Sequence, residues 1–338
     1  MAARQRSGTV WLLVLAGILV VVWSGYWLIA SFVAQEALTR INSGPVSGRT
    51  VTCATPAVSG YPFHLDVRCS RATFAEQGDR ITAAVGGIDA STTLYWPGYF
   101  EADLDMPLVV NAPAFGVALT AEWSAATAHG RAGIGGLRGG GASFVSLKAE
   151  NDGAIAGLPM QSATASAASA AVEPAGNSTA LVASARDLVL TRTDGTALPA
   201  IDADARITAV DLATLGTRPQ EVVLAWLRGT PNLTIDNVRI AMGGAIVTAT
   251  GNLSVSQDGL LSGSILLRYN SAEALGNLME TLRPGSRERF NVVLQGLQMM
   301  SVPATTEDGP MLQTTISIRN GITMVGIAPV GIIPAFRF

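Results

Sequence analysis

The feature that most constrains the fold is an uncharged run near the N-terminus. Thr9–Val33 contains twenty-five residues without a charge, and Arg4 and Arg6 precede it. At about 1.5 Å rise per residue, a helix of this length spans roughly 38 Å, against a hydrocarbon core of about 30 Å. We therefore predict one transmembrane anchor over residues 9–33.

The residues around the run set its expected limits and orientation. Trp11 near one end, and Trp23, Tyr26 and Trp27 near the other, suit two interfacial aromatic belts. The positive-inside rule places residues 1–8 in the cytoplasm and the large C-terminal body outside it. A cleaved signal peptide is the alternative, although its apolar region is usually shorter than this one. Residues 34–44 are expected to continue the helix beside the membrane.

The composition of the remaining chain favours a β-rich body. Charged residues make up 14% and glycine supplies 36 of 338 residues, with much Ala, Ser and Thr. Lys148 is the sole lysine and no basic run appears, so nucleic acid is not an expected partner. The fold class predicted is mainly β with flanking helices (α+β), an N-terminal membrane helix followed by antiparallel meander sheets.

We expect two parts in the body, a first β-rich part over residues 45–200 and a second over 201–338. In the first part, short apolar stretches alternate with Gly, Pro and Asn-Asp turn signals. The segment Gln161–Ala171 could form a strand, a weak helix or a linker; its period-two alternation of Ala with Ser and Thr favours the strand. The strands expected here are Ala72–Glu76, Ile81–Thr93, Glu101–Val110, Ala114–Ala126, Gly141–Glu150, Met160–Val172 and Thr179–Thr191.

For the second part, the sequence predicts a strand meander with helices. Leu233–Met242, Ala245–Ser256 and Leu260–Tyr269 read as strands joined at Gly243-Gly244 and Asp258-Gly259. A further hairpin is expected about Asn320-Gly321, and the apolar tail after Pro329 is expected to pack back on the sheet. Three helices are expected, Thr217–Arg228, Ser271–Leu282 with Asn270 as its N-cap, and Ser286–Met300.

One face of this meander is the candidate ligand surface. Alternate residues of the middle strands are apolar, as in a sheet with one covered and one solvated face. The helices could cover that face, or leave an open half-barrel or groove. The ligand-binding residues predicted on it are Val247, Leu253, Val255, Ile265 and Leu267.

Two cysteines flank a turn at Val58–Pro62. Cys53 and Cys69 are placed symmetrically about Tyr61 and would face each other across a hairpin. Outside the cytoplasm such a pair can form a disulfide; two buried free thiols are the alternative.

The sequence shows no recognisable catalytic, metal or cofactor equipment, so we predict a protein that is not an enzyme. His64 and His129 are isolated, without a second ligand at metal-site spacing. The glycines of Gly133–Gly141 depart from both phosphate-loop patterns and favour a flexible turn between strands. The pairs Asp103/Asp105 and Asp202/Asp204 resemble solvated strand faces more than catalytic or calcium-binding carboxylates.

Several stretches together resemble a known family. Val58–Leu65 after an N-terminal anchor, Ala225-Trp226 before the meander, Gly251–Leu253, Asp258–Gly263 and Gly331–Pro334 resemble an uncharacterised family of alphaproteobacterial inner-membrane proteins, labelled a domain of unknown function. The meander is also similar to the repeating strands of AsmA-like envelope proteins. That second resemblance implies the bacterial envelope and, for long members, movement of phospholipid along a hydrophobic β groove. The chain lacks the length expected of a bridge across the periplasm.

These observations predict a non-enzymatic protein of the bacterial inner membrane with a periplasmic body. The membrane is an expected partner. The protein is expected either to act in envelope assembly or lipid handling, with a lipid as its second partner, or to act as a scaffold that binds another envelope protein. A hydrolase with dispersed catalytic residues is the third class weighed. No nucleophile, base and orienting residue can be assembled for it around two isolated histidines.

Overall fold

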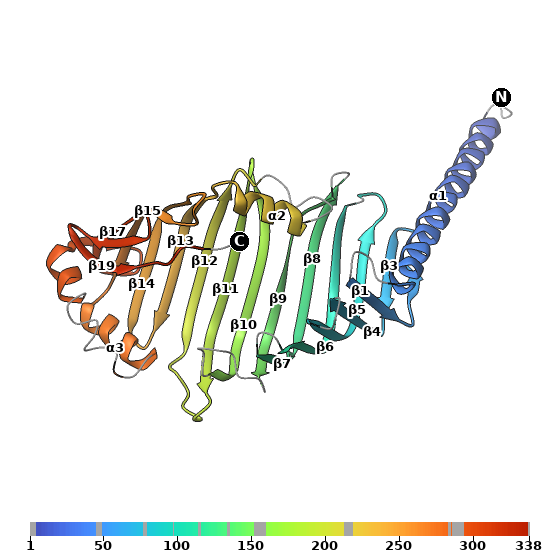
Figure 1. The fold of residues 1–338 in the computed structure, drawn as a ribbon. Helices are drawn as coiled ribbons and strands as arrows, with labels where there is room; N and C mark the ends of the chain where they lie inside the picture. Colours follow the sequence, from blue (N-terminus) through green and yellow to red (C-terminus); the bar gives the residue numbers. More distant parts are fainter. Residues whose placement is uncertain are drawn as a thin grey trace. The chain divides into compact units, whose positions relative to one another are not determined.

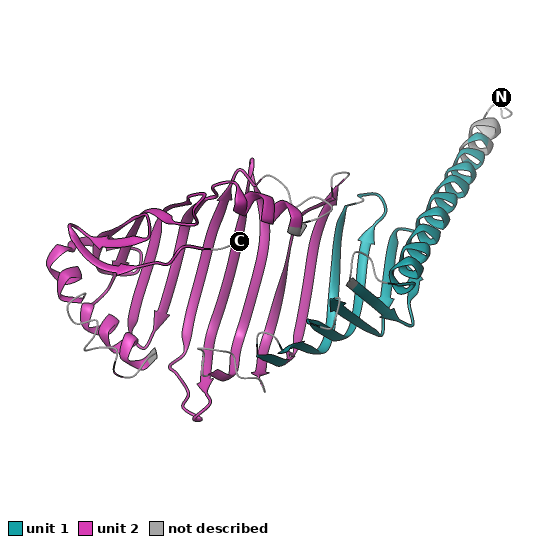
Figure 2. Ribbon diagram, in the orientation of Figure 1, with its two compact units in different colours: residues 1–119 teal, residues 120–338 magenta. Residues whose placement is uncertain are grey.

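A computed structural model describes residues 5–44, 49–76, 80–96, 98–113, 116–133, 136–151, 160–212, 219–282, 285 and 294–336. The chain forms two compact units, Met1–Leu119 and Thr120–Phe338 (Figure 2). The border expected between residues 200 and 201 falls inside the second unit. There Leu188 and Ile201 are partners in two neighbouring paired strands, so sheet pairing continues across that position.

Unit 1 begins with one long helix, α1 (Gln5–Asn42) (Figure 1). Its part from Leu13 to Asn42 is long and apolar enough to cross a membrane, a property that a signal sequence shares. The side chains from Leu13 to Val22 are exposed, because none of the described residues packs around this part of the helix. The other elements of the unit are β1 (Arg49–Ala54), β2 (Ala57–Ser59), β3 (His64–Cys69), β4 (Arg71–Glu76), β5 (Thr82–Thr93) and β6 (Tyr99–Ala112). β7 (Val117–Glu122) crosses the border between the units.

The first four strands are the two arms of one interrupted antiparallel hairpin. β1 pairs with β4 and β2 pairs with β3, and both β3 and β4 pair along the same edge of β5. Ser59 pairs with Asp66, so the ladder is centred between Pro62 and Phe63 and not on Tyr61. The expected hairpin is confirmed, but the cysteines, which lie symmetrically about Tyr61 in the sequence, are not direct partners in its ladder. Cys53 pairs with Ala72 in the ladder.

Unit 2 is an antiparallel sheet in which most strands pair with their neighbours in sequence (Figure 1). β15 pairs with β17, whose other edge carries β16 and β18. The sheet is open and does not close into a barrel, which agrees with the predicted mainly β fold. Its strands are β8 (Ala125–Gly133), β9 (Gly136–Asn151), β10 (Met160–Ala175), β11 (Ser178–Arg192), β12 (Ile201–Val210), β13 (Asn232–Met242), β14 (Ala245–Val255), β15 (Leu261–Tyr269), β16 (Val302–Thr306), β17 (Gly309–Arg319), β18 (Ile322–Val325) and β19 (Ala328–Ile332).

The strand predictions hold with two corrections. Ala114–Ala126 is not one strand, because β7 ends at Glu122 and β8 begins at Ala125; residues 114–115 lie outside the described part. The glycines 136–141 lie in β9 and not in a turn. They allow close packing, since a Cβ on Gly139 would lie 2.6 Å from the carbonyl oxygen of Val172 on β10. The segment Gln161–Ala171 is strand, within β10.

Three helical segments accompany this sheet: α2 (Pro219–Arg228), α3 (Ala272–Leu282) and residues 294–300. The expected starts at Thr217 and Ser286 lie outside the described residues. The N-cap prediction for α3 is wrong, because the hydroxyl of Ser271 accepts the hydrogen bond from the backbone N–H of Ala274. The side chain of Asn270 instead accepts from Ile246 N and donates to Gly244 O, which fixes the β13–β14 turn.

Candidate functional site: an apolar sheet face and a clamped helix

The sheet of unit 2 carries rows of apolar side chains that run across neighbouring strands. A row forms because residues directly paired in an antiparallel ladder point to the same face of the sheet. Small residues prevail on β10–β12 and β14, and larger ones on β13, β15 and β17. Three successive rows are Val172-Leu181-Ile207-Ile235-Gly251-Ile265-Ile316, Ala170-Ala183-Ala205-Val238-Ala249-Leu267-Thr314 and Ala168-Ala185-Ala203-Ile240-Val247-Tyr269-Leu312.

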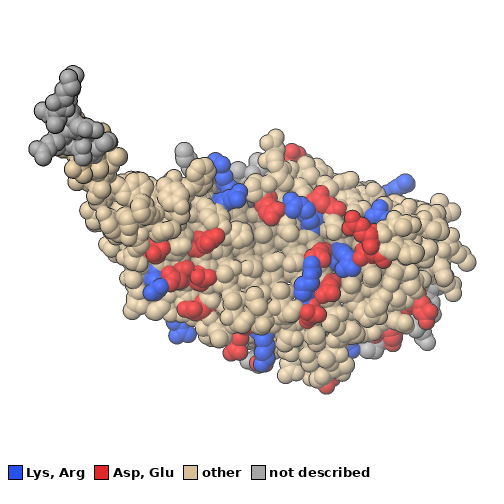
Figure 3. All heavy atoms as spheres, turned by 180° about the vertical axis from the view of Figure 1, so that it is seen from behind, with Lys and Arg blue, Asp and Glu red and all other residues tan. Residues whose placement is uncertain are grey.

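The residues between these rows form the opposite, polar face. One of its rows is Ser169-Ser184-Asp204-Arg239-Thr248-Arg268-Gln313. Basic and acidic side chains lie interspersed on the surface seen in Figure 3. Ion pairs join Arg186 to Asp204 at 2.6 Å and Arg206 to Glu173 at 3.1 Å. This face is therefore suited to water, and the two faces of one sheet differ sharply in polarity.

One ion pair joins β13 to the β16–β17 turn. Arg239 Nη2 donates to Asp308 Oδ1 at 2.7 Å and its Nε donates to Oδ2 at 3.2 Å, a bidentate arrangement. The hydrogen bond from Arg239 lowers the pKa of Asp308, and the same bond raises the pKa of Arg239. Both side chains are mostly removed from water, with 29% and 22% exposed, so this pair ties two distant segments together.

Helices cover the apolar face over β14, β15 and β17. Leu275 of α3 and Leu297 pack with the fully buried Tyr269, whose hydroxyl hydrogen-bonds Ser301 at 2.8 Å. At the other end of these strands the C-terminal tail packs back as expected. There Ile333 contacts the buried cluster of Val255, Leu261 and Ile318.

The five predicted ligand-binding residues lie on this covered part of the face. Val247 and Leu267 pack against the Tyr269 cluster, and Leu253 and Ile265 pack against the cluster that contains the buried Val255. The structure thus brings all five to one face, as the alternation indicated. That they bind a ligand stays a prediction.

The same face is more open over β10–β13. Leu181 and Ile240 are large apolar side chains with 48% and 39% of their surface exposed, and the alanines between them are only half-buried. Ala203 lies at the limit of this region, where it packs against the buried cluster of Leu198, Ile201 and Met242. We call the rest the open apolar face; it consists of Val172, Leu181, Ala183, Ala185, Ala205, Ile207, Ile235, Val238 and Ile240. The sequence prediction did not include these residues, although period-two alternation of Ala with Ser, Thr and charged residues marks them.

The second arrangement of interest lies in unit 1, where α1 packs against the hairpin. Trp23 Nε1 donates to Pro62 O at 2.7 Å, and Trp27 Nε1 donates to His64 O at 2.9 Å. The ring of Trp23 lies 6.2 Å from that of Phe63 between centroids, and Trp27 meets Tyr61 edge-on at 5.5 Å. Two aromatic residues expected in a lipid belt therefore also hold the turn of the hairpin.

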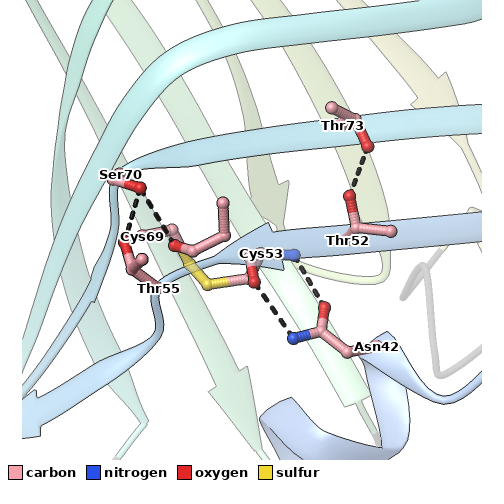
Figure 4. The surroundings of a disulfide bond; sticks show 8 residues. Asn42, Thr52, Cys53, Thr55, Cys69, Ser70 and Thr73 are labelled. Carbon is pink, nitrogen blue, oxygen red and sulfur yellow. Dashed lines mark hydrogen bonds between the residues drawn. A yellow bond between two sulfur atoms is a disulfide. The ribbon is translucent and has the colours of Figure 1, made fainter.

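Further along the same helix, Asn42 contacts the disulfide region (Figure 4). Cys53 N donates to Asn42 Oδ1 at 2.7 Å, and Asn42 Nδ2 donates to Cys53 O at 3.0 Å. Cys53 and Cys69 form the predicted disulfide, with their Cα atoms 5.3 Å apart. Because such bonds persist in oxidising compartments, the disulfide indicates that the β part of unit 1 lies outside the cytoplasm.

The remaining chemical candidates do not assemble into a site. Both histidines have exposed side chains, and His64 serves the hairpin turn through its backbone. Asp204 pairs with Arg186, and Asp202 accepts a hydrogen bond from the backbone N–H of Asp187, so both have structural partners. In the described part of the chain, no group of three or more His, Cys, Asp or Glu is placed to hold a metal ion.

Comparison with known families gives one match. Residues 27–334, about nine tenths of the chain, match the model of the family described as "Uncharacterized protein conserved in bacteria (DUF2125)". The chain belongs to this family. No curated protein and no solved structure matches the chain.

The DUF2125 match begins at Trp27, one of the two α1 tryptophans that contact the hairpin. It therefore includes Trp27, the hairpin that Trp27 contacts, and all of the open apolar face. The stretch Val58–Leu65 that carried the sequence resemblance is the hairpin turn itself. In this member of DUF2125 that stretch thus has a structural role, which is to receive α1.

Proposed function

We propose that this protein is a non-enzymatic, single-pass protein of the bacterial inner membrane that handles a lipid on its open apolar face. In this proposal residues 1–8 are cytoplasmic, α1 is an uncleaved anchor, and both units of the body are periplasmic. The proposal follows from Arg4 and Arg6 before the apolar run, the apolar length of the helix and the disulfide beyond it.

One observation carries the lipid part. Leu181 and Ile240 are substantially exposed on a face whose neighbouring side chains are alanine, valine and isoleucine, while the reverse face carries ion pairs. Extended apolar surface is costly in water, at roughly 25 cal/mol per Å². A sheet surface on which alanines lie between larger apolar side chains suits straight acyl chains, because they can lie across the small side chains without needing a deep pocket. The similarity of the meander to AsmA-like strands also supports a lipid as the ligand.

A photocrosslinking experiment in intact membranes tests this proposal. A photoreactive amino acid would replace Leu181 on the open apolar face or, as a matched control, Val182, which is adjacent but points to the polar face. The proposal expects lipid adducts at position 181 and few at 182, as identified by mass spectrometry of the full-length protein. Equal lipid labelling at the two positions, or none at 181, would refute it.

The second candidate function is a scaffold for another envelope protein. The observation that favours it is at the end of the sheet, where Ile327 directly before β19 and Ile332 at the end of β19 expose 92% and 81% of their surface. A strand with exposed apolar side chains can pair with an added strand of a partner. A single dominant protein adduct from a photoreactive residue at Ile332, together with no lipid adduct at 181, would favour the scaffold.

A further inference from the structure

The hairpin turn and the β5–β6 loop of unit 1 together form an uncharged edge rich in exposed aromatic residues. Tyr61, Phe63, Tyr95 and Trp96 expose 55%, 56%, 65% and 73% of their surface, and we call these four the aromatic tip. No charged residue occurs in the segments Thr50–Phe63 and Ala90–Phe100. Four large exposed rings on one edge are unusual for a surface that faces water.

Hydrogen bonds hold the two parts of the tip together. Leu94 N donates to Phe63 O at 3.0 Å, and the β3–β5 ladder pairs His64 with Thr93 just behind them. Tyr26 of α1 donates to Leu94 O at 3.4 Å. The aromatic tip is therefore fixed at the level of Trp23–Trp27 on the helix.

The path of the chain explains how the tip reaches this level. α1 continues past Trp27 to Asn42, which binds Cys53 on β1. From Cys53, β1 and β2 run back toward the Trp23–Trp27 level. The helix covers roughly 24 Å between residues 26 and 42, and the strands cover roughly 26 Å between residues 53 and 61, so the lengths of the two paths match.

The length of α1 then places this level relative to a bilayer. Starting from Thr9, the first residue of the predicted anchor, Trp23 lies roughly 21 Å and Trp27 roughly 27 Å along the helix. A hydrocarbon core is about 30 Å thick. The level of the aromatic tip therefore falls inside the outer boundary of the membrane and not beyond it. Leu28, Ile29, Phe32 and Val33, which lie further along α1, are also exposed and apolar.

We propose that the aromatic tip inserts into the outer headgroup and acyl-chain boundary of the same bilayer that α1 spans. This inference rests on the anchor part of the proposed function. Tyr and Trp are favoured at this depth because the ring is apolar and its O–H or N–H can meet the hydrated headgroups. Unit 1 then has two attachments to the membrane, the helix and the tip, so it is held in a defined orientation and cannot swing freely.

Acidic residues set the limit of insertion. Asp66 and Glu101 lie in one row across β3, β5 and β6, and Asp89 and Asp103 lie in a row two residues further from the tip. Asp66 is three residues from Phe63, which corresponds to roughly 10 Å along a strand. Insertion stops there because burying a carboxylate in lipid is costly. Since the tip itself is uncharged, its insertion requires no anionic lipid and is insensitive to salt.

The test uses the full-length protein in nanodiscs of phosphatidylcholine, with its native disulfide intact. An environment-sensitive dye would be attached to a single introduced cysteine, either beside the tip at the headgroup level (Ser59→Cys, opposite Asp66 in the β2–β3 ladder) or at the far end of the hairpin (Arg80→Cys). Ser59 and Arg80 are both exposed. Spin-labelled lipids with the quencher near the headgroup would then be added. We expect the dye at position 59 to lose more than half of its emission and the dye at position 80 to be unaffected.

A second position keeps the test independent of any folding defect at Ser59. The dye on Tyr95→Cys, in the β5–β6 loop, should be quenched in the same way as the dye at 59. Equal behaviour of positions 59, 95 and 80 overturns the inference, while lipid adducts at Leu181 would leave the lipid-handling function standing. A mature protein whose intact mass lacks α1 overturns both the anchor and the inserted tip. Quenching at 59 and 95 without any lipid adduct at 181 supports the inserted tip and refutes the lipid function alone.

Discussion

Asn42 binds both backbone groups of Cys53, so the end of α1 is fastened to a residue that is itself held by a disulfide. The two hydrogen bonds measure 2.7 and 3.0 Å (Figure 4). Cys53 lies in β1, whose ladder partner is β4. The amide of Asn42 thus satisfies backbone groups that face away from that ladder.

Replacement of Asn42 by alanine should release the backbone of Cys53. The loss of two hydrogen bonds at a partly buried position should cost about 1–3 kcal/mol locally. We expect hydrogen exchange at the Cys53 amide to become roughly 10–100 times faster, as measured by mass spectrometry on peptides that contain it. Thr39→Ala is the control, since the Thr39 hydroxyl bonds only to Gln35 O within the same helix. Unchanged exchange in Asn42→Ala would contradict the contact.

Removal of the disulfide should destabilise unit 1. Cys53 and Cys69 are separated by 16 residues, and closing a loop of that size in the unfolded chain is worth about 3 kcal/mol. The double variant Cys53→Ser, Cys69→Ser should therefore unfold at a lower temperature than the wild type. A reductant should lower the wild-type melting temperature to a similar value and leave that of the variant unchanged. A wild-type protein that is insensitive to reductant, with both thiols open to alkylation, would show that the bond is absent.

The sequence predicted the features of the fold that depend on local pattern. Alternation along Ala245–Val255 gave the strand and its apolar face, and the Asn320-Gly321 signal gave the β17–β18 hairpin. It failed where the determinant was a contact between distant residues. Asn270 has the chemistry of an N-cap, but its amide is used by Gly244 and Ile246, so the neighbouring Ser271 caps α3.

The candidate site follows the same division. The apolar alternation of β14 and β15 could be read from the sequence, whereas the part of the open apolar face on β10–β12 contains several alanines, and alanine gives little hydrophobic contrast with serine and threonine. Its extent became visible only from the ladder, in which Ala183 lies between Ala170 and Ala205. The contact between Trp23 and Pro62 could not be predicted either, because a tryptophan near a membrane boundary is already explained by lipid.

The ion pair between Arg239 and Asp308 should make stability depend on pH. Because the folded-state pKa of Asp308 is lowered, its contribution is present above its unfolded-state pKa of about 4 and is lost as the pH falls through the lower folded value. Asp308→Asn should lower the free energy of unfolding by about 1–2 kcal/mol at pH 7. The difference from the wild type should shrink below pH 4 in urea titrations.

The exposed pair Arg206–Glu173 offers the control for this measurement. Its side chains are 45% and 47% exposed, so Glu173→Gln should change the free energy of unfolding by less than about 0.5 kcal/mol at any pH. If Asp308→Asn and Glu173→Gln changed the free energy of unfolding equally at pH 7, the ion pair between Arg239 and Asp308 would have no stabilising role.

Alanine substitutions at Leu275 and Leu181 should distinguish the covered part of the apolar face from its open part. Leu275 is buried against Tyr269 and Leu297, so Leu275→Ala should leave a cavity and cost about 2–5 kcal/mol. Leu181 is about half exposed on the open apolar face, so Leu181→Ala should cost less than about 1 kcal/mol. Urea unfolding of the two variants measures this difference directly. Similar large losses for both would mean that something covers Leu181 in the folded protein, and the open apolar face would then be part of the core and not a surface for lipid.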